Sequence, residues 1–98
     1  MIYDFKTPYG EDIRVTVQRE QYHKGGIALE MIMEPDGEPY TTCTKWIPGL
    51  KEDEVAVKNY SENEGVLDFL VRNKIIEKPH RQEQVGFVSL YISKVLNI

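Results

Sequence analysis

Cysteine is almost missing from this chain of 98 residues, because Cys43 is the only one. A single cysteine excludes an internal disulfide, and nothing in its use indicates an oxidising compartment. Histidine is scarce too, and neither His23 nor His80 stands at metal-ligand spacing from Cys43 or from the other histidine. We therefore expect no metal and no cofactor, and we expect Cys43 to be a small buried apolar residue.

Long apolar runs and an excess of positive charge are also missing. No stretch approaches the roughly 20 apolar residues of a membrane-spanning helix, and residues 1–6 lack the basic and apolar regions of a signal peptide. The 12 Lys and Arg residues face 16 Asp and Glu residues, which gives a net charge of −4. This balance disfavours direct nucleic-acid binding and adhesion to anionic membranes. Because neither the cysteine usage nor a signal peptide indicates secretion, we expect a cytoplasmic protein.

What the sequence does contain is the composition of one small globular domain over residues 1–98, with 41% hydrophobic and 29% charged residues. Alternation of apolar and polar residues predicts strands at 13–17 and 27–33. The Asp36-Gly37 pair predicts a hairpin turn, after which residues 40–46 resume the strand pattern. A short buried strand is expected at 55–57.

One helix is predicted, over residues 62–73. Its apolar face consists of Val66, Leu67, Phe69, Leu70 and Val71. Asp68 and Arg72 are four residues apart and can form an ion pair on the exposed side. Ser61 and Glu64 have the spacing of a capping box, which predicts that the helix begins at about Glu62.

The predicted fold class is α+β, with one antiparallel sheet of about five or six strands and the helix packed on one face. Residues 77–83 are expected to form an exposed connection. The segment 85–96 fits both a strand and a helical stripe, and its β-branched content and Gly86 favour a strand.

A first candidate binding site surrounds the predicted helix start, where free backbone amides and the positive dipole end favour an anion or a carboxylate. Its residues are Asn59, Tyr60, Ser61, Glu62, Asn63 and Glu64. Capping is the commoner use of such residues, and the carboxylates of Glu62 and Glu64 would repel an anion.

A second candidate is an acidic patch formed by Glu52, Asp53, Glu54, Glu62, Glu64 and Asp68. Such a patch could bind a basic protein partner, or it could imitate DNA phosphates and inhibit a defence nuclease of the host. The ordinary alternative is a solvated face that serves solubility.

Trp46 and Tyr40 are expected on one face of their strand, where they would line the core if buried and mark a contact surface if exposed. No Ser or Cys lies in the signature of a known nucleophile, so a small hydrolase or ligand-binding enzyme is the less favoured hypothesis. The favoured function is a non-catalytic protein-interaction module, whose partner and oligomeric state the sequence leaves open.

The second half of the chain carries a family resemblance, from Pro48 to Val88. Pro48-Gly49-Leu50, the run from Val55 to Gly65, Pro79 and Gly86-Phe87-Val88 occur in an order that resembles a family of small uncharacterised proteins. Plasmids and conjugative elements of gut bacteria carry these proteins. The resemblance implies a bacterial, cytoplasmic accessory protein of a mobile element, and it implies no activity.

Overall fold

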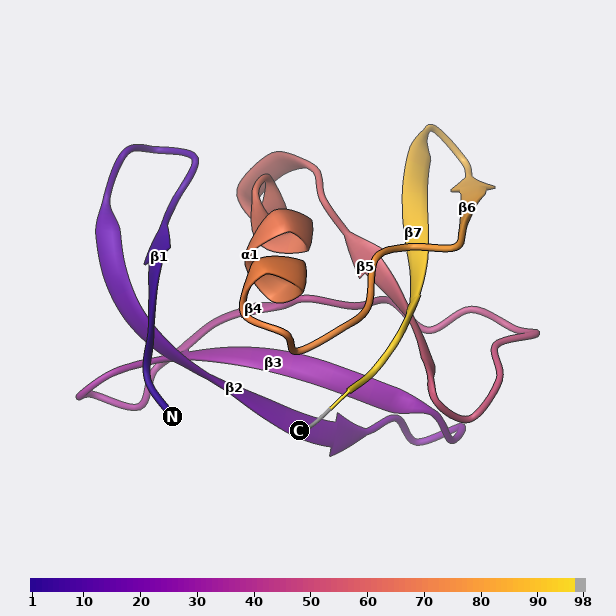
Figure 1. The fold of residues 1–98 in the computed structure, drawn as a ribbon, viewed down its shortest axis with the longest axis horizontal. Coiled ribbons are helices and arrows are strands. Elements are labelled where there is room, and N and C mark those ends of the chain that lie inside the picture. The colour runs from indigo at the N-terminus through magenta and orange to yellow at the C-terminus, as the bar shows by residue number, and fades with distance from the viewer. Residues whose placement is uncertain (97–98) are drawn as a thin grey trace.

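The first four strands form one antiparallel sheet. A computed structural model describes residues 1–96, in which the strands β1 (Tyr3–Lys6), β2 (Asp12–Gln21), β3 (Ile27–Met33) and β4 (Pro39–Thr42) follow one another in space in chain order. Figure 1 shows β2 and β3 as the long strands of this sheet, and they pair along Val15–Gln21 and Ile27–Met33. The alternation in the sequence therefore predicted these two strands correctly.

A second antiparallel sheet has three strands in the order β5-β7-β6. These strands are β5 (Glu54–Lys58), β6 (Arg81–Val85) and β7 (Val88–Lys94). Between β5 and β6 the chain forms a 3-10 turn (Ser61–Asn63) and the helix α1 (Val66–Arg72). The α+β class with one helix is confirmed, but within residues 1–96 seven strands in two sheets replace the expected single sheet of five or six.

The predicted strand 40–46 is divided between the two sheets. Its first part belongs to β4, and the N–H of Cys43 still donates to the carbonyl of Leu29 on β3. The next residues bond to β5, because Lys45 N–H donates to Ala56 and Thr44 bridges Val57. One extended segment thus turns from one sheet to the other, which is why a single sheet was the wrong expectation.

The C-terminal segment contains a hairpin. The expected exposed connection at 77–83 is wrong in its second half, because β6 begins at Arg81 and pairs with β7. The strand interpretation of 85–96 is confirmed for Val88–Lys94, and the helical stripe is wrong. The polar sequence of β6 has no apolar alternation of its own, and its pairing with β7 decides its conformation.

The main core lies where α1 meets both sheets (Figure 1). The Phe69 ring on α1 is fully buried and makes edge contacts with Tyr3 and Phe5 of β1, at centroid distances of 5.7 and 5.2 Å. Val55 and Val57 of β5 join the same core. Within residues 1–96, no helix is both long and apolar enough to cross a bilayer.

Candidate functional site

Two loops that are distant in the sequence enclose a hollow of about 320 Å³. One loop connects β2 to β3, and the other leads from Trp46 toward β5. We call this hollow the Trp46 groove, defined by Tyr22, Lys24, Ile27, Trp46, Leu50 and Glu52. It brings Trp46 and Glu52 together, which were separate candidates in the sequence.

Trp46 is 36% exposed, and the ammonium group of Lys24 lies over its ring. The Nζ of Lys24 lies 4.7 Å from the ring centroid, within the range of a cation–π contact. Lys24 precedes Gly25 and Gly26, whose φ angles of 90° and 92° are accessible mainly to glycine. The β2–β3 loop can therefore turn back and place Lys24 over the indole.

Tyr22 closes the inner end of the Trp46 groove. Its hydroxyl lies 2.7 Å from Thr44 Oγ1, which in turn accepts from the N–H of Leu29. Burial raises the pKa of the Tyr22 phenol further above neutral pH, where the hydroxyl is already protonated. This bonding holds the inner wall of the groove to β3.

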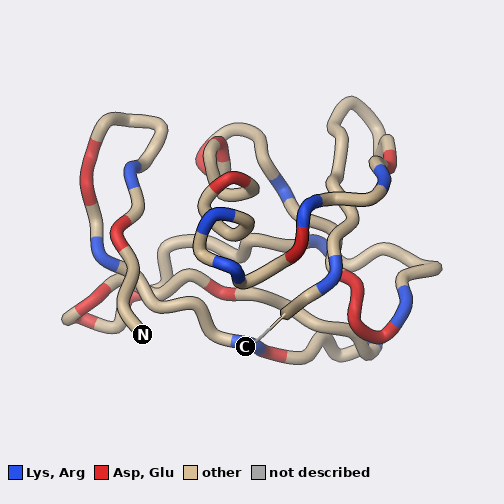
Figure 2. Tube along the Cα trace, in the orientation of Figure 1, with Lys and Arg blue, Asp and Glu red and all other residues tan. Residues whose placement is uncertain are grey.

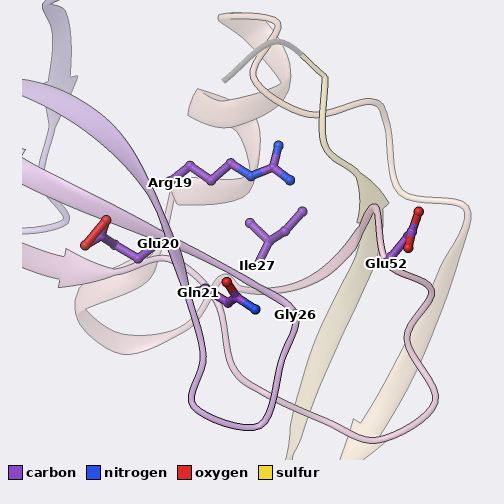
Figure 3. A pocket seen from close by; sticks show the side chains of 6 residues that line it. All are labelled: Arg19, Glu20, Gln21, Gly26, Ile27 and Glu52. Carbon is purple, nitrogen blue, oxygen red and sulfur yellow. The ribbon is translucent and has the colours of Figure 1, made fainter.

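A second hollow of about 250 Å³ adjoins the groove and shares Gly26, Ile27 and Glu52 with it. Figure 3 shows Arg19, Gln21 and Ile27 on the side of β2 and β3, with Glu52 on the loop across from them. The surface around Trp46 therefore continues toward the end of β2, and a carboxylate lies at its rim.

The residues of the predicted helix-start site are largely used to hold the fold together. The Asn59 Oδ1 accepts from the N–H groups of Gly65 and Leu67, at 3.1 and 3.0 Å, and so caps α1. Asn63 is buried and bonds to Thr41 and to the carbonyl of Thr42. Tyr60 is half-buried against the small core cluster that contains Ala56, Leu90 and Ile92.

The predicted capping box is wrong. Ser61 has a φ of 53° and begins the 3-10 turn, and within residues 1–96 its hydroxyl makes no hydrogen bond. The helix begins after Gly65, whose φ is 93°. The chain leaves the 3-10 turn at Glu64, whose ψ is 128°, and passes through the left-handed Gly65, so α1 starts four residues later than predicted.

The six acidic candidates do not form one patch. Glu52 and Asp53 precede β5, whereas Glu62 and Glu64 follow it, and five strand residues span roughly 16 Å. Figure 2 shows the two acidic groups in the loop before β5 and near α1. Asp53 lies 3.5 Å from Lys94, so one of these charges is also partly balanced.

The other two acidic candidates, Asp68 and Glu54, each lie beside an arginine. Asp68 pairs with Arg72 at 2.7 Å, as predicted. The Glu54 Oε2 lies 2.7 Å from His80 Nε2, and Oε1 lies 3.6 Å from Arg81. The arrangement therefore does not support the imitation of a continuous row of DNA phosphates.

Glu54 is the centre of a cluster that sequence reasoning missed. Its side chain is only 8% exposed, and Oε1 also accepts from the N–H of Lys51 at 3.0 Å. This backbone hydrogen bond, with His80 and Arg81, lowers the Glu54 pKa, while burial opposes the shift. Glu54 and His80 are 26 residues apart, so no local motif could have indicated the pair.

Cys43 lies in the main core, and Tyr40 packs against it. The Tyr40 ring packs edge-on against Phe5 at 5.9 Å. Trp46 follows the turn between the sheets, so the expectation that the two aromatics share one face is wrong. Cys43 is fully buried, as predicted, and burial raises its thiol pKa to about 12. A thiol in this state is a poor nucleophile.

Comparisons of the chain with protein-family models, with curated proteins and with solved structures give no match. The geometry of the Trp46 groove is therefore the basis for a functional proposal.

Proposed function

We propose that this protein is a non-catalytic protein-interaction module that binds a basic segment of a partner protein at the Trp46 groove. The observation that carries the proposal is the Lys24 ammonium held over the partly exposed Trp46 ring. The protein's own lysine occupies a position that suits a cation of a partner. A Lys or Arg of the partner replaces Lys24 there.

The exchange is physically reasonable because the ring and the rim both favour a cation. An exposed cation–π contact contributes only about 0.5–1 kcal/mol, so Lys24 is not held strongly. An incoming guanidinium stacks on an indole better than an ammonium does. Glu52 at the rim supplies a carboxylate, and Ile27 and Leu50 provide apolar surface for the methylene stem of the partner's side chain.

The enzyme alternative has one specific arrangement in its favour, which is His80 beside Glu54 at a hollow of about 220 Å³. A carboxylate that orients an imidazole is a common feature of general bases. Both oxygens of Glu54, however, already hold main-chain or side-chain groups of the fold. The described residues that line this hollow include no Ser, Thr or Cys nucleophile, so we place the interaction module first.

The biological setting belongs to the same proposal. The resemblance of Pro48–Val88 supports a bacterial, cytoplasmic accessory protein of a mobile element. A basic partner encoded by the host or by the element is consistent with the net charge of −4. Electrostatic attraction of this kind acts mainly on the association rate.

The test uses a defined probe, a short peptide of alternating Arg and Gly, with a Glu-Gly peptide of equal length as its control. Trp46 is the only tryptophan of the chain, so its fluorescence reports directly on the groove. We expect the Arg-Gly peptide to change this fluorescence and to shift the NMR signals of Gly25, Gly26 and the indole N–H. The Glu-Gly peptide is expected to have no effect.

Variants separate the groove from other exposed aromatics. We expect Trp46→Leu to abolish the NMR shifts at Gly25 and Gly26, whereas Tyr9→Ser, which removes a 74% exposed ring from the β1–β2 turn, keeps them. Equal responses to both peptides, or shifts that survive Trp46→Leu, would contradict the proposal.

A further inference from the structure

The outer edge of β6 is a second surface with the features of a contact site. The order β5-β7-β6 makes β6 the last strand of its sheet, and Arg81, Gln82 and Gln84 are exposed. Within residues 1–96, no group bonds to the main chain of Gln82 or Gln84 on the side away from β7. An exposed edge of this kind is a template for another strand.

The β6–β7 turn determines which main-chain groups point outward. Val85 pairs with Val88 across a two-residue turn, so these two residues exchange the hydrogen bonds that close the hairpin. Hydrogen-bonded pairs alternate along an antiparallel ladder, so Arg81 and Glu83 also bond toward β7. The N–H and C=O groups of Gln82 and Gln84 therefore point away from the sheet.

The charges on this edge are complementary to themselves. Arg81 and Glu83 project from the same face of β6 and pair at 2.8 Å, with 39% and 44% of their side chains exposed. If two β6 strands pair antiparallel with Gln82 opposite Gln82, each Arg81 faces the Glu83 of the other copy. Pairing with Glu83 opposite Glu83 would instead place like charges together, which is unfavourable.

We propose that β6 is a self-association surface, on which a second copy of this chain adds its own β6 in antiparallel orientation with Gln82 on the two-fold axis. The two Gln82 residues exchange main-chain hydrogen bonds, and the sheets β5-β7-β6 of the two copies form one six-stranded sheet. Four alternating charges, Arg81 and Glu83 from each copy, fix the register. This surface is separate from the Trp46 groove and does not depend on its function.

Sedimentation equilibrium of the full chain over a wide concentration range tests the proposal. We expect the mass to rise from the 11.4 kDa of one chain toward twice that value. Glu83→Arg places Arg81 opposite a second arginine in the proposed register, so we expect its self-association to be about tenfold weaker or more. Glu64→Arg changes the net charge equally, on an exposed residue beside the 3-10 turn, and is expected to leave the mass unchanged.

Mixing two charge variants gives a decisive comparison. Glu83→Arg carries only positive charge on β6, and Arg81→Glu carries only negative charge. Each is therefore expected to self-associate about tenfold more weakly than the wild type or worse when alone, and the two are expected to associate when they are mixed. Arg81 also lies 3.6 Å from Glu54, so circular dichroism and thermal melting of Arg81→Glu confirm that it is folded.

Gln82→Pro tests the main chain independently of charge. Proline lacks the backbone N–H that Gln82 directs away from β7. The β6–β7 ladder therefore keeps its hydrogen bonds, while the contact between copies loses two. We expect Gln82→Pro to be monomeric and Gln82→Thr to self-associate. A wild-type chain that is monomeric throughout, or charge variants that associate no better mixed than alone, would overturn the proposal.

Discussion

Asn59 and Ser61 show how neighbouring polar residues take different roles. Both belong to the run of hydrogen-bonding residues before α1, and the sequence pattern indicated Ser61 as the cap. In the structure Asn59 accepts from the two amides at the helix start, while Ser61 has a positive φ and its hydroxyl makes no hydrogen bond within residues 1–96. The distinction depends on the path of the chain through the 3-10 turn.

We expect Asn59→Ala to lower the free energy of unfolding by about 1 kcal/mol, because Gly65 and Leu67 lose their acceptor. Ser61→Gly is the matched comparison, because glycine accepts a φ of 53° without strain and no cap is lost. Urea denaturation at constant m-value measures both. If Ser61→Gly lowers the free energy of unfolding as much as Asn59→Ala does, Ser61 contributes to the cap of α1 after all.

At the scale of the elements, the Glu54 side chain joins the start of β5 to the preceding loop and to the start of β6. Glu54 begins β5, its carboxylate bonds to the Lys51 N–H of the preceding loop, and it pairs with His80 and Arg81 at the start of β6. The two outer strands of the second sheet are thus joined at one end by a buried carboxylate, with β7 between them.

This connection predicts a dependence of stability on pH. The Glu54 pKa is lowered in the folded protein, so the folded state binds this proton less readily than the unfolded state. Its contribution is complete above the unfolded glutamate pKa of about 4.3 and is lost as the pH falls through the lower folded value. Glu54→Gln is expected to remove this part of the acid sensitivity and to reduce stability at pH 7.

Denaturant midpoints of the wild type and Glu54→Gln, measured from neutral pH downward, give the difference. Glu64→Gln removes one charge from an exposed carboxyl beyond the other end of β5 and controls for net charge. If the wild type and Glu54→Gln lose stability in parallel below pH 5, the carboxylate of Glu54 does not stabilise the fold.

At the scale of the whole molecule, the acidic residues are distributed over separate surfaces. Glu52 lies at the rim of the Trp46 groove, and Glu62 lies in the 3-10 turn beyond the far end of β5. A single contact through both residues, as the acidic run suggested, would need a partner that reaches along the whole length of β5. The groove offers a shorter contact that uses Glu52 alone.

We expect Glu52→Lys to weaken binding of the Arg-Gly peptide and Glu62→Lys to leave it unchanged. Added salt should reduce the affinity of the wild type more than that of Glu52→Lys, because the Debye length falls from about 10 Å at 0.1 M to about 3 Å at 1 M. Fluorescence titrations of Trp46 at both salt concentrations measure this. Equal weakening by the two substitutions would place the contact on both acidic groups.

Several features were determined by the sequence alone, because they depend on neighbours within a few residues. Alternation set the strands β2 and β3, a 3.6-residue period set the buried face of α1, and the Asp68–Arg72 spacing set an ion pair. Asp36-Gly37 determined a turn between β3 and β4. Such patterns act through local backbone geometry, so they are visible without knowing the fold.

Only the tertiary structure decided which segments pair and what they enclose. The passage of residues 43–45 from one sheet to the other, the strand conformation of the polar segment 81–85 and the Glu54–His80 contact all join residues far apart in sequence. The Trp46 groove likewise arises because the β2–β3 loop lies against the loop before β5. These contacts depend on long-range packing and hydrogen bonding, which the polarity of each segment does not specify.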